Sequence, residues 1–254
     1  MSAAVLVRQE GTALVIAIDR PAARNAVTRE VSIAIATALD RLDADPELRT
    51  GILTGNGGHF CAGMDLKAFA AGERPELEHR GFGGLTERPP VKPLIAAVEG
   101  FALAGGCELV LACDLIVAAD NAVFGLPEVT RGLVAGSGGL VRLPRRIPAA
   151  IALEYALTGA RLAATDAHRW GLVNRLTSPG HALAGALELA RSIAANAPLS
   201  VIMTKRIVRE ASDWSDAEVW DRQRPLVDAV VGSEDAREGA RAFAEKRAPV
   251  WRGR

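Results

Sequence analysis

Two glutamates beside glycine-rich turns are the residues of this chain best suited to chemistry. Glu108 lies three residues after Gly105 in the run AVEGFALAGGCELVLACD. If a helix begins near Gly105, its first backbone N–H groups lack intrahelical acceptors, and the Glu108 side chain leans back toward them. Free amides beside a carboxylate suit a reaction that builds negative charge on a carbonyl oxygen while a proton moves nearby. A tightly packed helix start, with its glutamate stabilised by the helix dipole, is the simpler alternative.

A second glycine-rich loop offers a further free amide. Residues 50–54 predict a short strand, and the loop GNGGHFCAGMDL follows it. Within this loop Gly63 and Met64 present a backbone N–H, and Asp65 is a predicted helix N-cap. If the strands before the two loops are parallel, both loops open at one edge of a sheet, where α/β folds bind ligands. The two loops would then give two donors for one oxyanion.

Glu128 is the second candidate acid, and it lies in a third segment. The run FGLPEVTRGLVAGSGG places Glu128 directly after Pro127, which fixes the local backbone, and glycine-rich sequence follows. A lone Pro-Glu pair also fits the first turn of a helix or an exposed turn. Residues 140–146 then predict a helix.

The elements that position these residues predict an α/β core with a helical end. Residues 95–98 predict a buried strand and residues 100–104 a turn, and strands and helices alternate through residue 174. Residues 70–92 mix charges with glycines and paired prolines, which fits a mobile connector or pocket lid, or simply a solvated loop. The other predicted elements are a hairpin at 5–8 and 14–18 around Gly11, a helix at 28–42, and C-terminal helices at 181–196, 199–211, 215–231 and 234–246.

Composition excludes several classes of function. The chain has 254 residues, of which 49% are hydrophobic and 24% charged, as in a soluble globular protein. Thirty basic and thirty acidic residues balance, so nothing indicates nucleic acid or an anionic membrane as partner. The three cysteines, Cys61, Cys107 and Cys113, lack metal-ligand spacing and predict reduced packing residues in a cytoplasmic protein. We find neither a signal peptide pattern nor a membrane-spanning segment.

Other kinds of site are weakly supported. No G-x-G-x-x-G follows the first strand, and the glycine-rich stretches lack the lysine of a phosphate loop. The run AGSGG resembles a nucleophile elbow around Ser137, but alanine replaces the first glycine. The four histidines are scattered, so we predict no metal site. A non-enzymatic oligomeric scaffold stays open, and it would require both glutamates to be buried in salt bridges.

Several of these strings together resemble the crotonase family, the enoyl-CoA hydratase/isomerase superfamily. The resemblance holds in order and spacing over nearly the whole chain. The strings are DRPAARNAV, HFCAGMDL, KPLIAAVEGFALAGGCELVLACDLIVAA, FGLPEVTRGLVAGSGGLVRLPR, ALTG, AHRWGLVN and AFAEKRAPVWRGR. The resemblance implies a core of ββα units at residues 1–195 that holds a CoA-thioester site. It also implies a C-terminal helical oligomerisation region at residues 196–254.

The same resemblance assigns site residues. The backbone N–H groups of Met64 and Gly105 would form the oxyanion hole. Glu108 would polarise the attacking water as base, and Glu128 would exchange a proton with the substrate α-carbon. Met64 departs from the alanine common in well-studied hydratases, and its bulk is expected to narrow the acyl pocket. The expected contacts to substrate or CoA are Arg24, Ala26, Ala62, Gly63, Asp65, Leu66 and Gly136, with Phe243 and Lys246 reaching the CoA of a neighbouring subunit.

The resemblance predicts an enoyl-CoA hydratase that adds water reversibly to a 2-enoyl-CoA and gives a 3-hydroxyacyl-CoA. CoA enters as part of the substrate, and no metal or redox cofactor is expected. Both glutamates are present, which favours a hydratase over branches that lack one or both. A double-bond isomerase is the alternative, as is a specialised hydratase such as crotonobetainyl-CoA hydratase, which the tail AEKRAPVWRGR resembles. Family resemblance also implies a trimer or a dimer of trimers.

Overall fold

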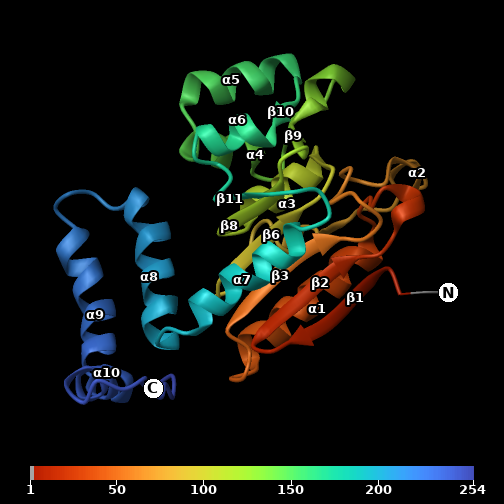
Figure 1. Cartoon of the computed structure of the whole chain (residues 1–254). Coiled ribbons are helices and arrows are strands. Elements are labelled where there is room, and N and C mark those ends of the chain that lie inside the picture. Colours follow the sequence, from red (N-terminus) through yellow and green to blue (C-terminus); the bar gives the residue numbers. More distant parts are fainter. Residues whose placement is uncertain (1–2) are drawn as a thin grey trace.

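Six strands form the central sheet of the computed structural model, which describes residues 3–254 (Figure 1). β1 (Val5–Glu10) and β2 (Ala13–Ile18) form the predicted antiparallel hairpin, and from β2 onward all neighbours are parallel. The strand order is β1-β2-β3-β6-β8-β11, with β3 (Thr50–Gly55), β6 (Leu94–Val98), β8 (Leu115–Ala119) and β11 (Arg175–Thr177). β2 and β6 are continuous apolar runs, and β3 is almost wholly buried as well, because both faces of the sheet are covered.

Alternate residues of these strands feed two separate cores. Leu14 and Ile16 lie in the larger core, on the face covered by α1 (Arg29–Ala44). Val15 lies in the smaller core with Ala186 of α7 (Ala182–Ala194), on the other face. This division follows from the two-residue period of a strand. It leaves the carboxyl ends of the parallel strands free to carry loops.

One predicted turn is wrong. Residues 101–103 form a strand, β7 (Phe101–Leu103), in a second sheet with β9 (Val123–Gly125) and β10 (Leu162–Ala163). Only the two ends of the predicted turn bend the chain, Gly100 directly after β6 with a φ of +56° and Ala104 before α3 (Gly105–Ala112) with a φ of +51°. The residues between them are therefore free to extend, and they pair with β9.

The interpretation of residues 70–92 as a solvated loop is also wrong in part. A small ribbon of β4 (Glu76–Leu77) and β5 (Gly81–Phe82) lies here, and residues 81–86 are all buried. Glycines permit this burial, since Gly83 lies against Leu109, and both Gly83 and Gly84 have positive φ. The backbone therefore packs against α1 and α3 (Gly105–Ala112) where a longer side chain would collide.

The remaining elements of the core are short. The 3₁₀ turns are η1 (Pro21–Ala23), η2 (Pro127–Arg131), η3 (Leu143–Arg145) and η4 (Ala211–Asp213). The helices are α2 (Leu66–Ala70), α3 (Gly105–Ala112), α4 (Gly139–Arg142), α5 (Ala149–Thr158) and α6 (Ala164–Arg169). The helix predicted at residues 140–146 is split into α4 and η3. Pro144, which lacks a backbone N–H, lies at the start of η3.

Three C-terminal helices extend away from the core on one side, as Figure 1 shows. They are α8 (Pro198–Glu210), α9 (Val219–Val231) and α10 (Glu234–Ala244), within a few residues of the predicted ranges. No residue of α8 or α9 is buried. Within residues 3–254, no helix combines the length and the hydropathy needed to cross a membrane.

Candidate active site

Two backbone N–H groups face one another across the loops after β3 and β7. Cys61 N–H donates to Phe101 O at 3.1 Å, and Leu103 N–H donates to Cys61 O at 3.0 Å. These bonds bring Gly63 so close that a Cβ on it would lie 3.2 Å from Gly105 N. The N–H groups of Met64 and Gly105 find no acceptor among residues 3–254. The loops thus bring two free donors close together, although β3 and β7 belong to different sheets.

Close packing fixes the start of α3. A Cβ on Gly105 would lie 2.5 Å from the Phe82 ring, and a Cβ on Gly106 would lie 2.3 Å from Cys61 O. Ala104, directly before the helix, has a positive φ of 51°. The tightly packed helix start proposed as the simpler alternative is therefore real. It accounts for both glycines, and the free N–H groups exist in addition to it.

Glu108 is held in place from the opposite side. Its residue is 3% exposed, and its Oε1 accepts hydrogen bonds from Ser137 N at 2.7 Å and Gly139 N at 2.9 Å. Burial raises the pKa of this carboxyl, while the two N–H groups and the charge of Arg142 lower it. Because hydrogen bonds to the carboxylate favour its charged form, they oppose protonation of Glu108.

Glu128 occupies a different environment on η2. Its Oε2 is buried and has no hydrogen-bond partner among residues 3–254. Burial raises the pKa of Glu128, and the negative charge of Glu108 raises it further. Neither glutamate takes part in an ion pair within the described part of the chain, so the condition for the scaffold alternative is not met. The arrangement suits Glu108 as the ionised group and Glu128 as the protonated one.

The segment from Arg24 to Val27 runs beside the loop that carries Met64. Ala62 N donates to Arg24 O at 3.1 Å, Val27 N to Gly63 O at 2.8 Å, and Asp65 N to Val27 O at 3.0 Å. Ala26 is buried, whereas the side chains of Arg24 and Leu66 are exposed. The two segments expected to contact CoA therefore lie together.

Asp65 caps α2 as predicted. Its Oδ1 accepts hydrogen bonds from Lys67 N and Ala68 N, and its Oδ2 pairs with Arg20 at 2.9 Å. The Arg20 guanidinium also donates to Ala26 O. Asp65 is thus fully used in holding the loop, which favours a structural role at the site.

Sequence reasoning missed three supports of the site. Asn25 is fully buried, and its Nδ2 donates to Asn56 O at 2.8 Å and His59 O at 2.7 Å. Arg20 was passed over, as were the amides of the Gly136–Gly139 stretch that hold Glu108. The signal for the amides was present, because glycine-rich sequence that opens a helix presents N–H groups to an anion.

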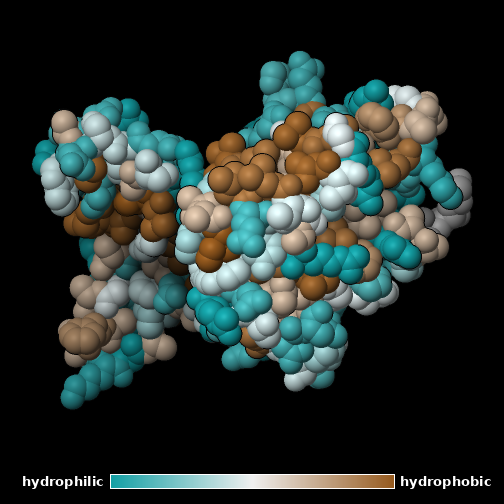
Figure 2. All heavy atoms as spheres, turned by 90° about the horizontal axis from the view of Figure 1, so that it is seen from above, coloured by the Kyte–Doolittle hydropathy of each residue, from teal (hydrophilic) through white to brown (hydrophobic). Residues whose placement is uncertain are grey.

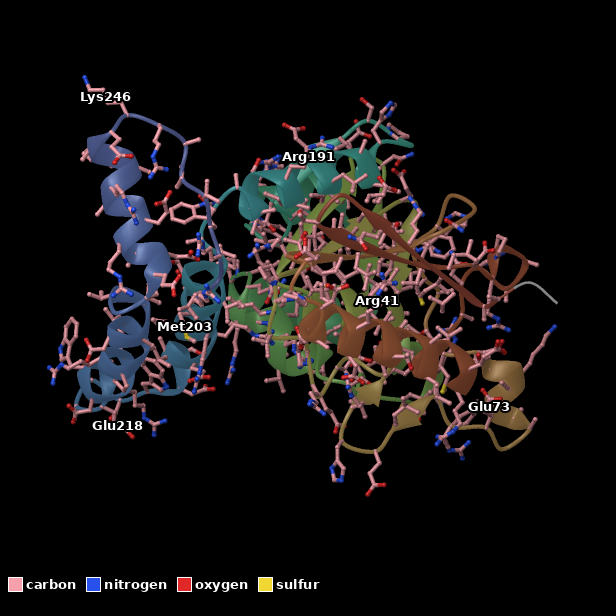
Figure 3. All side chains as sticks on the ribbon, turned by 90° about the horizontal axis from the view of Figure 1, so that it is seen from below. Arg41, Glu73, Arg191, Met203, Glu218 and Lys246 are labelled. Atoms are coloured by element: carbon pink, nitrogen blue, oxygen red, sulfur yellow. The ribbon has the colours of Figure 1, made fainter. Side chains whose placement is uncertain are left out.

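Gly136 lies beside Glu108, because it is exposed and directly precedes Ser137, whose N–H donates to Glu108 Oε1. The two expected contacts on and after α10 lie elsewhere. Phe243 is 87% exposed near the end of α10, and Lys246 lies at the far tip of the C-terminal helices, as Figure 3 shows. Within a single chain, Phe243 and Lys246 are therefore not brought to the site.

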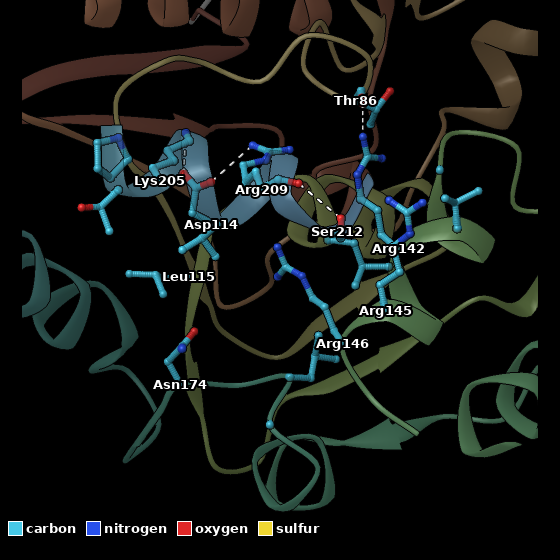
Figure 4. Close-up of a pocket in the computed structure, with 18 of the residues that line it drawn as sticks. Thr86, Asp114, Leu115, Arg142, Arg145, Arg146, Asn174, Lys205, Arg209 and Ser212 are labelled. Carbon is cyan, nitrogen blue, oxygen red and sulfur yellow. Dashed lines mark hydrogen bonds and ion pairs between the residues drawn. The ribbon is translucent and has the colours of Figure 1, made fainter. Parts of the chain in front are cut away.

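A large cleft of about 1560 Å³ lies between α8 and the core, behind the loop at residues 136–138 that holds the Glu108 carboxylate (Figure 4). Its lining includes neither glutamate, but it includes Ser137 and Arg142. The cleft therefore reaches the back of the loop that holds Glu108.

Comparison with known proteins agrees with this geometry. The sequence model of a family described as enoyl-CoA hydratase/isomerase matches residues 8–254. A carnitinyl-CoA dehydratase from Salmonella typhi is 46% identical over 262 residues, covering 100% of both chains.

Solved structures resemble the whole chain. The crystal structure of an enoyl-CoA hydratase from Mycobacterium tuberculosis H37Rv has a TM-score of 0.98 and is 58% identical, with 100% of both chains covered. The crystal structure of a carnitinyl-CoA hydratase from Mycobacterium avium has a TM-score of 0.80 and is 46% identical, again over 100% of both chains.

Proposed function

The chain belongs to the enoyl-CoA hydratase/isomerase family, the crotonase family, and is a hydratase-type enzyme, a lyase; on this basis we propose that it hydrates a 2-enoyl-CoA reversibly to a 3-hydroxyacyl-CoA. The observation that carries the proposal is the pair of free N–H groups at Met64 and Gly105 beside two glutamates in unequal environments. Such donors stabilise an oxyanion, and such a pair of acids serves proton transfer.

In the proposed reaction the thioester carbonyl of the substrate accepts hydrogen bonds from Met64 N and Gly105 N. As the water oxygen bonds to C3, charge moves to the carbonyl oxygen, and fixed amides contribute about a hundredfold or more in rate per donor. Glu108 takes a proton from the water, and Glu128 gives its proton to C2. The sum is addition of H and OH across the double bond. CoA takes part only as a portion of the substrate, and the proposal needs no metal or redox cofactor.

The position of CoA follows from the paired segments around residues 24–27 and 62–65. Their backbones lie side by side next to the Met64 N–H, so a thioester bound there extends its CoA portion along them. Arg24 is exposed and is a candidate contact for a phosphate group. Three unpaired, buried cysteines support a reducing, cytoplasmic setting for the reaction.

The acyl group is the finer part of the proposal. Met64 provides more side-chain volume at its position than alanine would, which favours a short acyl chain. The relatives named carnitinyl-CoA dehydratase favour crotonobetainyl-CoA as the second candidate substrate. Moving a double bond with Glu108 or Glu128 as proton shuttle is the alternative reaction.

The test offers the purified protein three thioesters: crotonyl-CoA, crotonobetainyl-CoA and a 3-enoyl-CoA. We expect loss of the enoyl-thioester absorbance with crotonyl-CoA and formation of 3-hydroxybutyryl-CoA. Faster turnover of crotonobetainyl-CoA would transfer the assignment to the specialised hydratase. Conversion of the 3-enoyl-CoA alone would replace hydration by isomerisation.

We also propose that the protein works as a trimer or a dimer of trimers. Figure 2 shows apolar residues gathered on the upper face of the core. The exposed apolar residues of the stretch that contains η2, α4 and α5 are Val129, Leu133, Val134, Leu140, Val141, Leu153 and Leu157. Further apolar side chains are exposed on and after α9, among them Val231 and Phe243. A monomer rarely leaves so much apolar surface in water. Sedimentation that shows a fully active monomer at assay concentration would contradict this assembly.

A further inference from the structure

Arg142 joins two loops that support opposite parts of the site. Its guanidinium donates to Ser137 O at 3.2 Å and also to Thr86 O (Figure 4). Ser137 is the residue whose N–H holds Glu108 Oε1 at 2.7 Å. The Arg142 side chain, which lines the cleft, therefore contacts the Ser137 loop on the side opposite Glu108.

The second partner leads to the oxyanion side. Thr86 is 2% exposed and ends the buried segment 81–86, and its N–H donates to Phe82 O at 3.3 Å. The Phe82 ring lies where a Cβ on Gly105 would be, so this segment packs directly on the start of α3. The Arg142 guanidinium thus connects the Ser137 loop, which holds Glu108, with segment 81–86, which packs against Gly105.

The shape of arginine matters for this bridge. The guanidinium is planar, is always charged and carries donors in a fixed fork, whereas a lysine amine is a point charge on a flexible stem. Gly138 also makes room for the bridge, because a Cβ there would lie 2.1 Å from Arg142 Nη1. The bridge therefore depends on Gly138, which precedes α4, as well as on Arg142 at the end of α4.

The charge of Arg142 acts on Glu108 as well. It lowers the pKa of Glu108 against the larger opposing effect of burial. Nearby on η2, the pKa of Glu128 is raised by the charge of Glu108 and lowered by that of Arg131. Arg142 in turn lies near Arg146 and Arg209, and it forms no ion pair with a carboxylate of residues 3–254. Its positive charge is therefore available to the site.

We propose that Arg142 is a positioning residue of the hydration reaction, which fixes the Glu108 carboxylate relative to the Gly105 N–H and favours its ionised form. The proposal rests on the proposed function. It adds a residue that does not touch the substrate but acts through the Ser137 loop and through segment 81–86.

The experiment compares Arg142→Met with Arg142→Lys, and uses Arg145→Met as the matched control. Arg145 lines the same cleft but pairs with Asp213 on η4 and makes no hydrogen bond to the Ser137 loop. We expect kcat to fall about ten- to a hundredfold in both Arg142 variants, because small misplacements of catalytic groups have effects of this size. Arg145→Met keeps the parent kcat.

The pH profile separates the two effects of Arg142. In Arg142→Met the acidic limb of kcat/KM moves to higher pH, since Glu108 loses a favourable positive charge. In Arg142→Lys the charge is kept, so the limb stays near that of the parent although kcat is low. If Arg142→Met does not fold, the lysine variant still tests the fork.

A measurement without substrate keeps this proposal separate from the proposed function. Infrared titration follows the Glu108 carboxyl band, assigned by its loss in Glu108→Gln. The band of Arg142→Met is expected to titrate at higher pH than that of the parent. An unmoved Glu108 titration, a parent-like kcat in Arg142→Met, or equal losses in Arg142→Met and Arg145→Met would overturn the proposal. A parent protein that hydrates no enoyl-CoA would instead overturn the proposed function.

Discussion

The two glutamates differ in the elements that carry them. Glu108 lies on α3, an eight-residue helix in which every residue is buried, and two backbone amides hold its Oε1. Glu128 lies on η2, a 3₁₀ turn without a buried residue, and its Oε2 has no partner within residues 3–254. Burial raises the pKa of both carboxyl groups, but two backbone amides oppose this effect at Glu108, whereas the charge of Glu108 adds to it at Glu128. This difference indicates how two identical side chains take different roles.

Replacing either carboxyl group should have the largest effect on the hydration rate. We expect Glu108→Gln and Glu128→Gln each to lose about a hundred- to ten-thousandfold in crotonyl-CoA hydration, because each removes one proton transfer. Loss of enoyl-thioester absorbance measures the rate, while circular dichroism and calorimetry with CoA check that fold and binding are kept. If Glu128→Gln alone still moves a double bond, the isomerase alternative replaces hydration.

Crowding Glu108 should have a smaller effect. A Cβ on Gly139 would lie 3.1 Å from both Cγ and Oε1 of Glu108, so Gly139→Ala displaces the carboxylate from its two amides. We expect about a tenfold loss in kcat with little change in KM. Gly232→Ala, at the end of α9, is the control and should keep the parent rate. A Gly139→Ala enzyme as fast as the parent would show that the position of Glu108 is not critical.

The pH dependence of kcat/KM tests whether the two glutamates differ in protonation state. Both carboxyl groups have raised pKa values, mainly because of burial, and the effect of Glu108 on Glu128 adds to this. The proposed reaction needs Glu108 ionised and Glu128 protonated, so the profile should be bell-shaped. Its acidic limb should lie above the ordinary range of a glutamate, and the two limbs belong to the pair. Raising the pH through the upper pKa removes the proton of Glu128 and lowers the rate. A flat profile across this range would exclude the pair as acid and base.

Much of this site was predictable from the sequence. The diglycine at Gly105 and the cap at Asp65 predicted the two loops, since glycines and cap residues act locally. The family resemblance then named Met64, Glu108 and Glu128. The strand at residues 101–103 was missed because only its partner β9, distant in sequence, makes it a strand.

The supports of the site were harder to predict for the same physical reason. Segment 81–86 is glycine-rich and lies in a stretch of mixed charge, and only its packing against α1 and α3 shows that it is buried. Arg142 also contacts Ser137, and Asn25 also contacts Arg20, which are near in sequence, but the bonds of Arg142 to Thr86 and of Asn25 to Asn56 join residues 56 and 31 positions apart. No local pattern encodes such contacts.

The smallest expected effect concerns the exposed edge of the proposed CoA site. Arg24→Ala should weaken CoA binding about two- to fivefold at low salt and less at high salt, because an exposed charge pair is weak and screened. Calorimetry at two ionic strengths measures this. Affinity that does not change at low salt would remove Arg24 from the site.

We propose that Glu108 and Glu128 act as one unit in hydration. The most direct test measures crotonyl-CoA hydration by the parent, both single glutamine variants and the double variant under identical conditions. We predict that the double variant loses less than the product of the two single losses, because once one partner is gone the other has little left to contribute. Losses that multiply, or single variants that keep the parent rate, would contradict the claim.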